Sequence, residues 1–286
     1  MLSEVKAERK TIVIVDGHNL LFRMFYGIPN SIKNSKGLEI KGLIGFIGSI
    51  KKLATEFNPF SIIVIFDSET SRFNNEQIEE TYKANRKDYT NVEESDNPFS
   101  QLPLIKKALE HLNISNLEVV DNEADDYIAS IIKSKKRFYN FIIVSTDTDF
   151  FQLIDKNVFV YAQRGKKSVL YDKQLIKEKY GIFPSQYVVF KSLIGDRCDN
   201  ISGVNGIGKV TASQILSYET IERFIEKNNN QRLINLLKDN IEIINKNQKL
   251  ILLNDKIDAS NTGFKLLSEK VYLKKVREII EEIGFL

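Results

Sequence analysis

Three short apolar runs stand out in the N-terminal half of the chain, each bounded by polar segments. They are TIVIVD (11–16), SIIVIFD (61–67) and NFIIVSTD (140–147). Runs that are apolar at nearly every position are typical of strands buried on both faces of a parallel sheet. Segments with apolar residues at helical spacing separate or follow them, at 43–57, 99–112 and 124–136. We therefore predict an α/β fold with a mostly parallel central sheet flanked by helices.

Two stretches depart from this alternation. Residues 68–98 are polar, carry both signs of charge and have only weak helical periodicity. A polar insertion of this length within a compact domain is expected to be functional or mobile, and not part of the core. After about residue 181 the spacing becomes helical, as in FPSQYVVFKSLIGD, VTASQILSYETIERFIEK and VYLKKVREIIEEIGF. We predict an α/β core at 1–180 that contains the insertion, followed by a helical region at 181–286.

Composition narrows the class of protein without identifying it. Of the 286 residues, 42% are hydrophobic and 28% are charged, which is ordinary for a globular chain. No apolar run approaches the roughly 20 residues of a membrane span, and the polar N-terminus lacks a signal-peptide core. Cys198 is the single cysteine, so an intramolecular disulfide is excluded. We expect a cytoplasmic monomer with no membrane partner, and the net charge of +3 does not decide what it binds.

Acidic residues follow each of the three predicted strands, at the edge where open α/β sheets bind their ligands. Others begin a predicted helix or follow one in the C-terminal region. The candidate ligands are Asp16, Asp67, Glu123, Asp125, Asp126, Asp147, Asp149, Asp196 and Asp199. Any one of these motifs could simply cap a helix or favour its dipole. Together they predict a common site.

The spacing of these acids points to metal ions. Glu123 and Asp126 are three apart, which places both on one helix face. Asp147 and Asp149 are two apart and would point the same way in an extended turn. Converging carboxylates repel unless cations neutralise them, and oxygen ligands select Mg²⁺ or Mn²⁺. Two such ions about 4 Å apart could clamp a phosphodiester. His18 and His111 are expected to have no metal-ligand partner, with His111 at a surface or helix end.

A glycine-rich segment, GVNGIGK at 203–209, lies between two predicted helices. Glycines permit a tight hairpin whose bare N–H groups can approach a phosphate beside a helix N-terminus. Such a contact grips the nucleic-acid backbone without reading bases. We predict a helix–hairpin–helix at about 190–218, although a plain glycine-rich connector would share the pattern. The candidate DNA-binding residues here are Gly203, Gly206, Gly208 and Lys209.

The polar insertion contains YKANRK at 82–87. Lys83 and Arg86 are three apart and would share one face of a helix. A basic arm of this kind suits a single strand, and Tyr82 could stack on a base. A solvated charged loop is the alternative.

In this order, the motifs VDGHNLLFR, FDSE, YKANR, NEADD, STDTDFFQL and GDRCDNISGVNGIGKVTA resemble those of bacterial and phage flap endonucleases. They are similar also to the 5′ nuclease domain of bacterial DNA polymerase I. The resemblance implies a PIN-like nuclease core in which the nine acids hold two metal ions. It implies that 68–98 forms a helical arch, with Lys83 and Arg86 against the scissile phosphate. It further implies K⁺ at the carbonyl groups of Val204 and Ile207, and it leaves the role of Arg72 open.

We therefore expect a 5′ nuclease with 5′–3′ exonuclease and flap endonuclease activity. Its substrate would be DNA, as a branched or 5′-ended duplex with a flap single strand, and region 181–286 would bind the duplex. Two alternatives stay open from the sequence. One is a catalytically weak, structure-specific DNA-binding paralogue, and the other is a PIN-type ribonuclease.

Overall fold

The computed structural model describes residues 9–68, 89 and 92–267. They divide into two compact units. The first unit comprises 9–68, 89, 92–146 and 255–267, and the second comprises 147–254. The division at about residue 180 that the sequence suggests stays a prediction.

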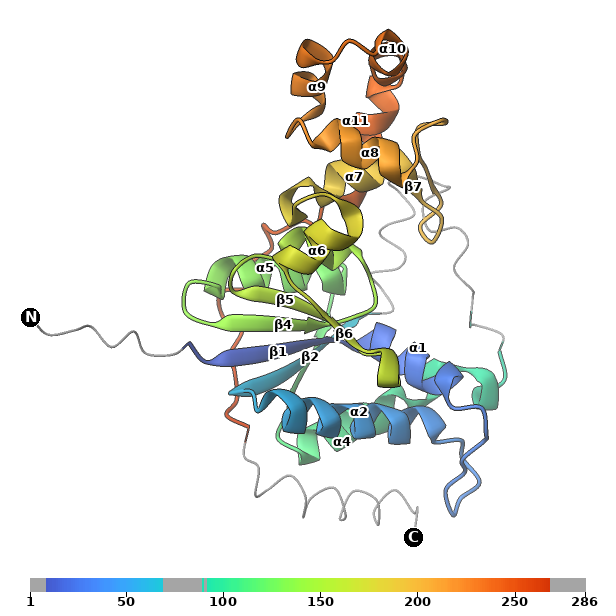
Figure 1. The fold of residues 1–286 in the computed structure, drawn as a ribbon. Helices are drawn as coiled ribbons and strands as arrows, with labels where there is room; N and C mark the ends of the chain where they lie inside the picture. Colours follow the sequence, from blue (N-terminus) through green and yellow to red (C-terminus); the bar gives the residue numbers. More distant parts are fainter. Residues whose placement is uncertain (1–8, 69–88, 90–91, 268–286) are drawn as a thin grey trace, which may run out of the picture. The chain divides into compact units, whose positions relative to one another are not determined.

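A parallel sheet forms the centre of the first unit (Figure 1). Its strands are β1 (Thr11–Asp16), β2 (Ser61–Asp67), β3 (Ser115–Val119) and β4 (Asn140–Val144), in the order β3-β2-β1-β4. Each neighbouring pair is parallel, and Ile14 lies opposite both Ile63 and Ile143. The interiors of β1, β2 and β4 are buried, as their continuous apolar runs require. The predicted fold class is confirmed.

Within the described residues of the first unit, four α-helices pack around this sheet. They are α1 (Gly17–Gly27), α2 (Lys41–Phe57), α4 (Leu102–His111) and α5 (Ala124–Lys135), and two short 3₁₀ turns, η2 (Glu94–Asp96) and η3 (Pro98–Gln101), precede α4. α1 packs against α2, α2 against α4, and α5 on β1, β2 and β3. Phe46 of α2 stacks on Phe66 of β2, with ring centroids 6.1 Å apart. Because α1 starts directly after β1, its N-terminus lies at the carboxyl edge of the sheet.

The second unit begins with the 3₁₀ turn η4 (Asp149–Leu153) and an antiparallel pair of strands, and continues mainly as helices. The pair is β5 (Val158–Ala162) and β6 (Val169–Tyr171), with η5 (Gly165–Lys167) between them. Next come α6 (Lys173–Tyr180), η6 (Pro184–Gln186), α7 (Tyr187–Ile194), β7 (Gly195–Asp196) and β8 (Ile201–Ser202). The last helices are α8 (Lys209–Leu216), α9 (Ile221–Lys227), α10 (Gln231–Asp239) and α11 (Ile241–Ile251). α7 packs against both α8 and α11.

Three predicted elements differ in detail. The strand expected at 140–147 ends at Val144, because Asp149 already begins a 3₁₀ turn. The helix expected across 210–227 is two helices, because Glu219 has a φ of 76° and the Thr220 side chain caps α9. The region after 181 is not entirely helical, since β7 and β8 pair antiparallel. The helix expected at 271–285 lies outside the described residues. Among the described helices, none has both the length and the apolar character that a membrane crossing requires.

Candidate metal centre

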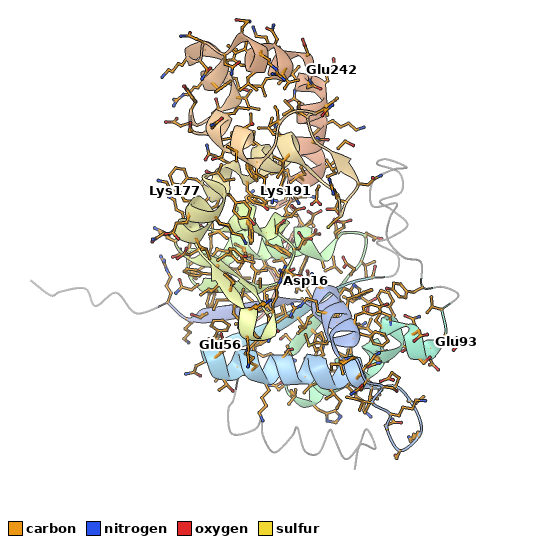
Figure 2. All side chains as sticks on the ribbon, turned by 45° about the vertical axis from the view of Figure 1, so that its right-hand side comes forward. Asp16, Glu56, Glu93, Lys177, Lys191 and Glu242 are labelled. Atoms are coloured by element: carbon orange, nitrogen blue, oxygen red, sulfur yellow. The ribbon has the colours of Figure 1, made fainter. Side chains whose placement is uncertain are left out.

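The first unit gathers acidic residues where its parallel strands end. β1 ends in Asp16 and β2 in Asp67, and Asp16 lies opposite Ile65, two residues before Asp67. Figure 2 shows Asp16 where β1 passes into α1. Both carboxylates therefore lie at the same edge of the sheet, as the sequence predicts.

Hydrogen bonds orient the Asp16 carboxylate through both of its oxygens. The backbone N–H of Asn19 donates to Oδ1 over 3.1 Å, which makes Asp16 the N-cap of α1. The hydroxyl of Ser145, just after β4, donates to Oδ2 over 2.9 Å. Asn19 in turn accepts from the backbone N–H and the hydroxyl of Thr146. The end of β4 and the start of α1 thus hold this carboxylate in place.

Asp67 is held in a similar way by α1 and α5. The N–H of Ala124 at the start of α5 donates to Oδ1 over 2.7 Å, and Nδ1 of His18 lies 3.1 Å from Oδ2. The sequence gives His18 no partner among the candidate ligands, but α1 places its ring beside the candidate Asp67. His111 is exposed at the end of α4, as expected.

The acidic start of α5 lies next to Asp67 through the Ala124 contact. Glu123 is the N-cap, with extended backbone angles (φ −79°, ψ 147°), so it precedes the helix instead of sharing its surface. Asp125 and Asp126 occupy the first turn, and Asp125 accepts the N–H of Asp126 over 3.0 Å. Negative side chains at this position also favour the helix dipole. Their role as metal ligands stays a prediction.

The second unit brings three carboxylates into one cluster. Ligand oxygens of Asp149, Asp196 and Asp199 all lie within 4.8 Å of one another. Asp149 comes from η4, Asp196 from β7 and Asp199 from the turn that follows β7. Asp147 accepts the backbone N–H of Asp149 over 2.8 Å. The extended turn expected for Asp147 and Asp149 is wrong, since Thr148 is helical and Asp149 begins the 3₁₀ turn.

Lys191 of α7 is buried beside this cluster, with 5% of its side chain exposed (Figure 2). Its ammonium contacts the carboxylates of both Asp149 and Asp196. Burial lowers the pKa of Lys191, but the charges and hydrogen bonds of Asp149 and Asp196 together outweigh burial and raise the pKa overall. Sequence reasoning missed this residue. The available signal was a single lysine inside the otherwise apolar helix YVVFKSLI, since a buried lysine needs a partner.

The charge of the cluster fits a bound cation. Burial raises the pKa of Asp149 to about 7, against the opposing effect of Lys191. Lys191 supplies one positive charge beside three carboxyl groups. The donors are carboxylate oxygens, which prefer hard divalent ions such as Mg²⁺ or Mn²⁺. Cys198 lies between two of them in sequence, but the charge of Asp196 raises the pKa of its thiol and keeps it protonated.

The hairpin after the acidic turn has the close packing that its glycines allow. Any Cβ on Gly203 would collide with the backbone of Ile194 and Gly195. Gly206 has a φ of 91°, a left-handed angle that favours glycine. Gly208 differs, since its φ is −96° and no atom lies within 4 Å of its Cβ position. The side chains of Val204 and Ile207 are buried, and Ile207 donates its N–H to the Val204 carbonyl over 3.0 Å.

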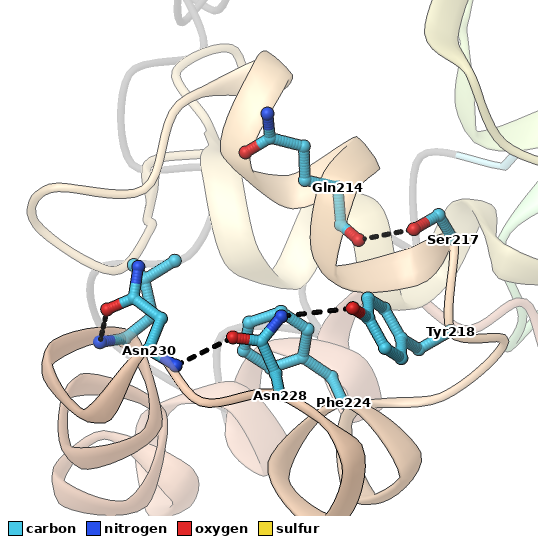
Figure 3. A pocket seen from close by; sticks show the side chains of 7 residues that line it. Gln214, Ser217, Tyr218, Phe224, Asn228 and Asn230 are labelled. Carbon is cyan, nitrogen blue, oxygen red and sulfur yellow. Dashed lines mark hydrogen bonds between the residues drawn. The ribbon is translucent and has the colours of Figure 1, made fainter.

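A pocket of about 280 Å³ lies between α8, α9 and α10 (Figure 3). It is lined by Gln214, Ser217, Tyr218, Phe224, Asn228, Asn230 and Leu233. Asn228 donates to the Tyr218 hydroxyl and accepts the N–H of Asn230, while Asn230 caps α10 through the N–H of Leu233. These polar side chains of the pocket hydrogen-bond to one another and to the backbone of the loop between α9 and α10. We therefore assign the pocket no ligand.

Two family models match the chain, one in its N-terminal part and one in its C-terminal part. The model of the 5′–3′ exonuclease N-terminal resolvase-like domain covers residues 11–181, and that of the 5′–3′ exonuclease C-terminal SAM fold covers 182–274. The chain belongs to the 5′–3′ exonuclease family. The family resemblance seen in the sequence motifs is thereby confirmed.

Individual known proteins are also similar to this chain in sequence or in fold. DNA polymerase I of Caldicellulosiruptor bescii is 35% identical over 221 residues, which is 75% of this chain and 25% of that protein. The chain thus spans about a quarter of that relative's length. A structure of T5 5′-exonuclease with zinc ions bound has a TM-score of 0.68 at 25% identity, covering 96% of this chain and 100% of that one. The fold also matches bacteriophage T5 D15 flap endonuclease in complex with DNA and metal ions, with a TM-score of 0.68 at 24% identity over 97% of this chain and 100% of that one.

The candidate residues of the polar insertion cannot be placed in the site. Arg72, Tyr82, Lys83 and Arg86 fall outside the described residues.

Proposed function

We propose that this member of the 5′–3′ exonuclease family is a divalent-metal-dependent 5′ nuclease with 5′–3′ exonuclease and flap endonuclease activity on DNA. The observation that carries the proposal is the cluster of Asp149, Asp196 and Asp199 beside a buried lysine. The T5 relatives, whose structures contain metal ions or DNA with metal ions, support it.

Mg²⁺ is the proposed ion, with Mn²⁺ as a substitute. When bound, such an ion activates water and neutralises charge on the phosphate. The protein holds the carboxylate oxygens in place before an ion binds. In the first unit it does so through hydrogen bonds to Asp16 and Asp67, and in the second through the ion pair of Lys191 with Asp149. The further proposed ligands are Glu123, Asp125, Asp126 and Asp147. That all nine acids serve one centre with two ions stays a prediction.

The hairpin at 203–209 is proposed to bind the duplex backbone. The open space at Gly208, at the N-terminus of α8, leaves room for a phosphate, and Lys209 is exposed beside it. K⁺ at the carbonyls of Val204 and Ile207 would strengthen this contact. Tyr82, Lys83 and Arg86 would hold the flap single strand, with Lys83 and Arg86 against the scissile phosphate. A monomeric state and a cytoplasmic location stay predictions.

A 5′-labelled DNA flap duplex, incubated with and without Mg²⁺, tests the proposal. The wild type should cut only with Mg²⁺, and Asp67→Asn and Asp149→Asn should lose cleavage while still binding the flap in Ca²⁺. Asp239→Asn, at an exposed position of α10, is the matched control and should cut normally. Binding without cleavage in Mg²⁺ or Mn²⁺ would instead indicate a DNA-binding paralogue. Cleavage of an RNA flap alone would indicate a PIN-type ribonuclease.

A further inference from the structure

His18 has a fixed place beside Asp67. Its Nδ1 lies 3.1 Å from Oδ2 of Asp67, and 13% of its side chain is exposed. The ring meets Phe99 edge-on, with centroids 5.3 Å apart and planes at 86°, and is tilted on Phe66 at 5.6 Å. Aromatic neighbours on two sides limit the rotation of the imidazole. Its donor is therefore aimed at the carboxylate.

Gly17 makes this placement possible. A Cβ at position 17 would overlap the ring of Phe66 and lie 2.8 Å from the carbonyl oxygen of Ile65. Only a glycine lets the first turn of α1 lie this close to β2, the strand that ends in Asp67. The close approach brings His18, the next residue, to the carboxylate.

The two oxygens of Asp67 accept hydrogen bonds from different elements. Oδ1 accepts the N–H of Ala124 over 2.7 Å, and Oδ2 faces the imidazole. An ionised carboxylate only accepts, so Nδ1 of His18 carries the proton in this contact. Nε2 is buried and has no hydrogen-bond partner among the described residues. The tautomer is thus assigned by the partner on the Nδ1 side.

We infer that His18 is a positioning residue for Asp67 and raises the affinity of the site for divalent ions. This inference rests on the proposed role of Asp67 as a metal ligand. The Nδ1–H bond fixes the plane of the carboxylate that would meet the ion. Outer hydrogen bonds of this kind typically change metal affinity or activity by about 10- to 100-fold. A ring that served only to fill space would have no such effect.

Two substitutions separate positioning from packing. His18→Asn keeps an N–H donor close to the place of Nδ1, whereas His18→Leu fills the space without a donor. Calorimetric titration of Mn²⁺ into the DNA-free protein should give an affinity about 10- to 100-fold weaker for His18→Leu. His18→Asn should recover most of the loss. The Mg²⁺ concentration for half-maximal flap cleavage should shift in the same order.

Equal Mn²⁺ affinity in a folded His18→Leu variant would overturn the inference, as would an equal loss in His18→Asn. If His18→Leu does not fold, ¹⁵N NMR of the wild-type imidazoles still decides. The chain has only two histidines, so His111→Gln assigns the signals. An Nδ1–H tautomer at His18 is expected, and an Nε2–H tautomer would overturn the inference. A wild type that neither binds Mn²⁺ nor needs a metal for cleavage would instead refute the proposed function.

Discussion

The side-chain amide of Asn247 on α11 donates a hydrogen bond to the carbonyl oxygen of Ser202 in β8, over 2.8 Å. The same Nδ2 donates to the carbonyl of Ser192 in α7, over 3.0 Å. Asn247 is buried, with 4% of its surface exposed. Its amide links α7 to β8, the elements on either side of the segment that carries Asp196 and Asp199. One amide therefore fixes the backbone from which Asp196 and Asp199 project.

Removing this amide should destabilise the second unit. Asn247→Ala leaves two carbonyls without their donor, and a buried unsatisfied group costs about 1–3 kcal/mol. We expect the free energy of unfolding in urea to fall by at least about that amount. Asn245→Ala, on the exposed side of the same helix, is the control and should change little. Similar losses in both variants would mean that the amide bonds contribute nothing specific.

Lys191→Met should expose the repulsion within the acidic cluster. Removing one partner of a buried ion pair costs about 3–5 kcal/mol, because the other charge stays buried. Thermal unfolding without metal should therefore show a large loss relative to Lys238→Met, an exposed control on α10. Saturating Mg²⁺ should restore more stability to Lys191→Met than it adds to the wild type. The same stability in both variants would show that the ammonium does not neutralise the cluster.

Metal binding and stability should both depend on pH through Asp149. Burial raises its pKa to about 7 from an ordinary value of 3.8. Between these values the folded protein keeps a proton that the unfolded chain has released, so stability without metal should fall as pH rises. A divalent ion competes with this proton, and its affinity should weaken about tenfold per pH unit below neutrality. Mn²⁺ titrations between about pH 5 and pH 8 measure this slope. Asp149→Asn should reduce the pH dependence of the Mn²⁺ affinity. An equally steep dependence in that variant would mean that a group other than Asp149 releases the proton.

The two hairpin glycines should respond differently to substitution. Gly206→Ala forces a side chain into a left-handed backbone and should cost about 1–2 kcal/mol. Gly208→Ser places a favourable N-cap residue in open space and should leave stability unchanged or slightly higher. If this loop grips the duplex, Gly208→Ser should nevertheless weaken DNA binding at fixed salt. Unchanged affinity would count against Gly208 as a contact.

Much of the α/β framework follows from local patterns. β1, β2 and β4 are continuous apolar runs, and such runs have few alternatives to a buried parallel strand. β3 (SNLEV) was not predicted, because its residues are mixed and only Val119 is buried. The break between α8 and α9 also escaped prediction, since the left-handed angle at Glu219 has no glycine to announce it.

The candidate ligands could be found from sequence, but their supports could not. Asp16 and Asp67 are recognisable because strand ends are recognisable. His18 lies 49 residues from Asp67, and Lys191 lies 42 from Asp149, so only the folded chain brings each pair together. Helical spacing identifies Lys191 and Asn247 as positions on buried faces without naming the groups they meet.

The bare Cα of Gly17 also limits how the chain can change over generations. A Cβ at position 17 would overlap the ring of Phe66 and lie 2.8 Å from the backbone carbonyl oxygen of Ile65. A smaller residue at position 66 would remove the first clash but not the second, because the second is with the backbone of β2. A larger residue at position 17 therefore requires two changes, the loss of the ring at position 66 and a displacement of β2 from α1. Lineages that carry a larger residue at position 17 should show both.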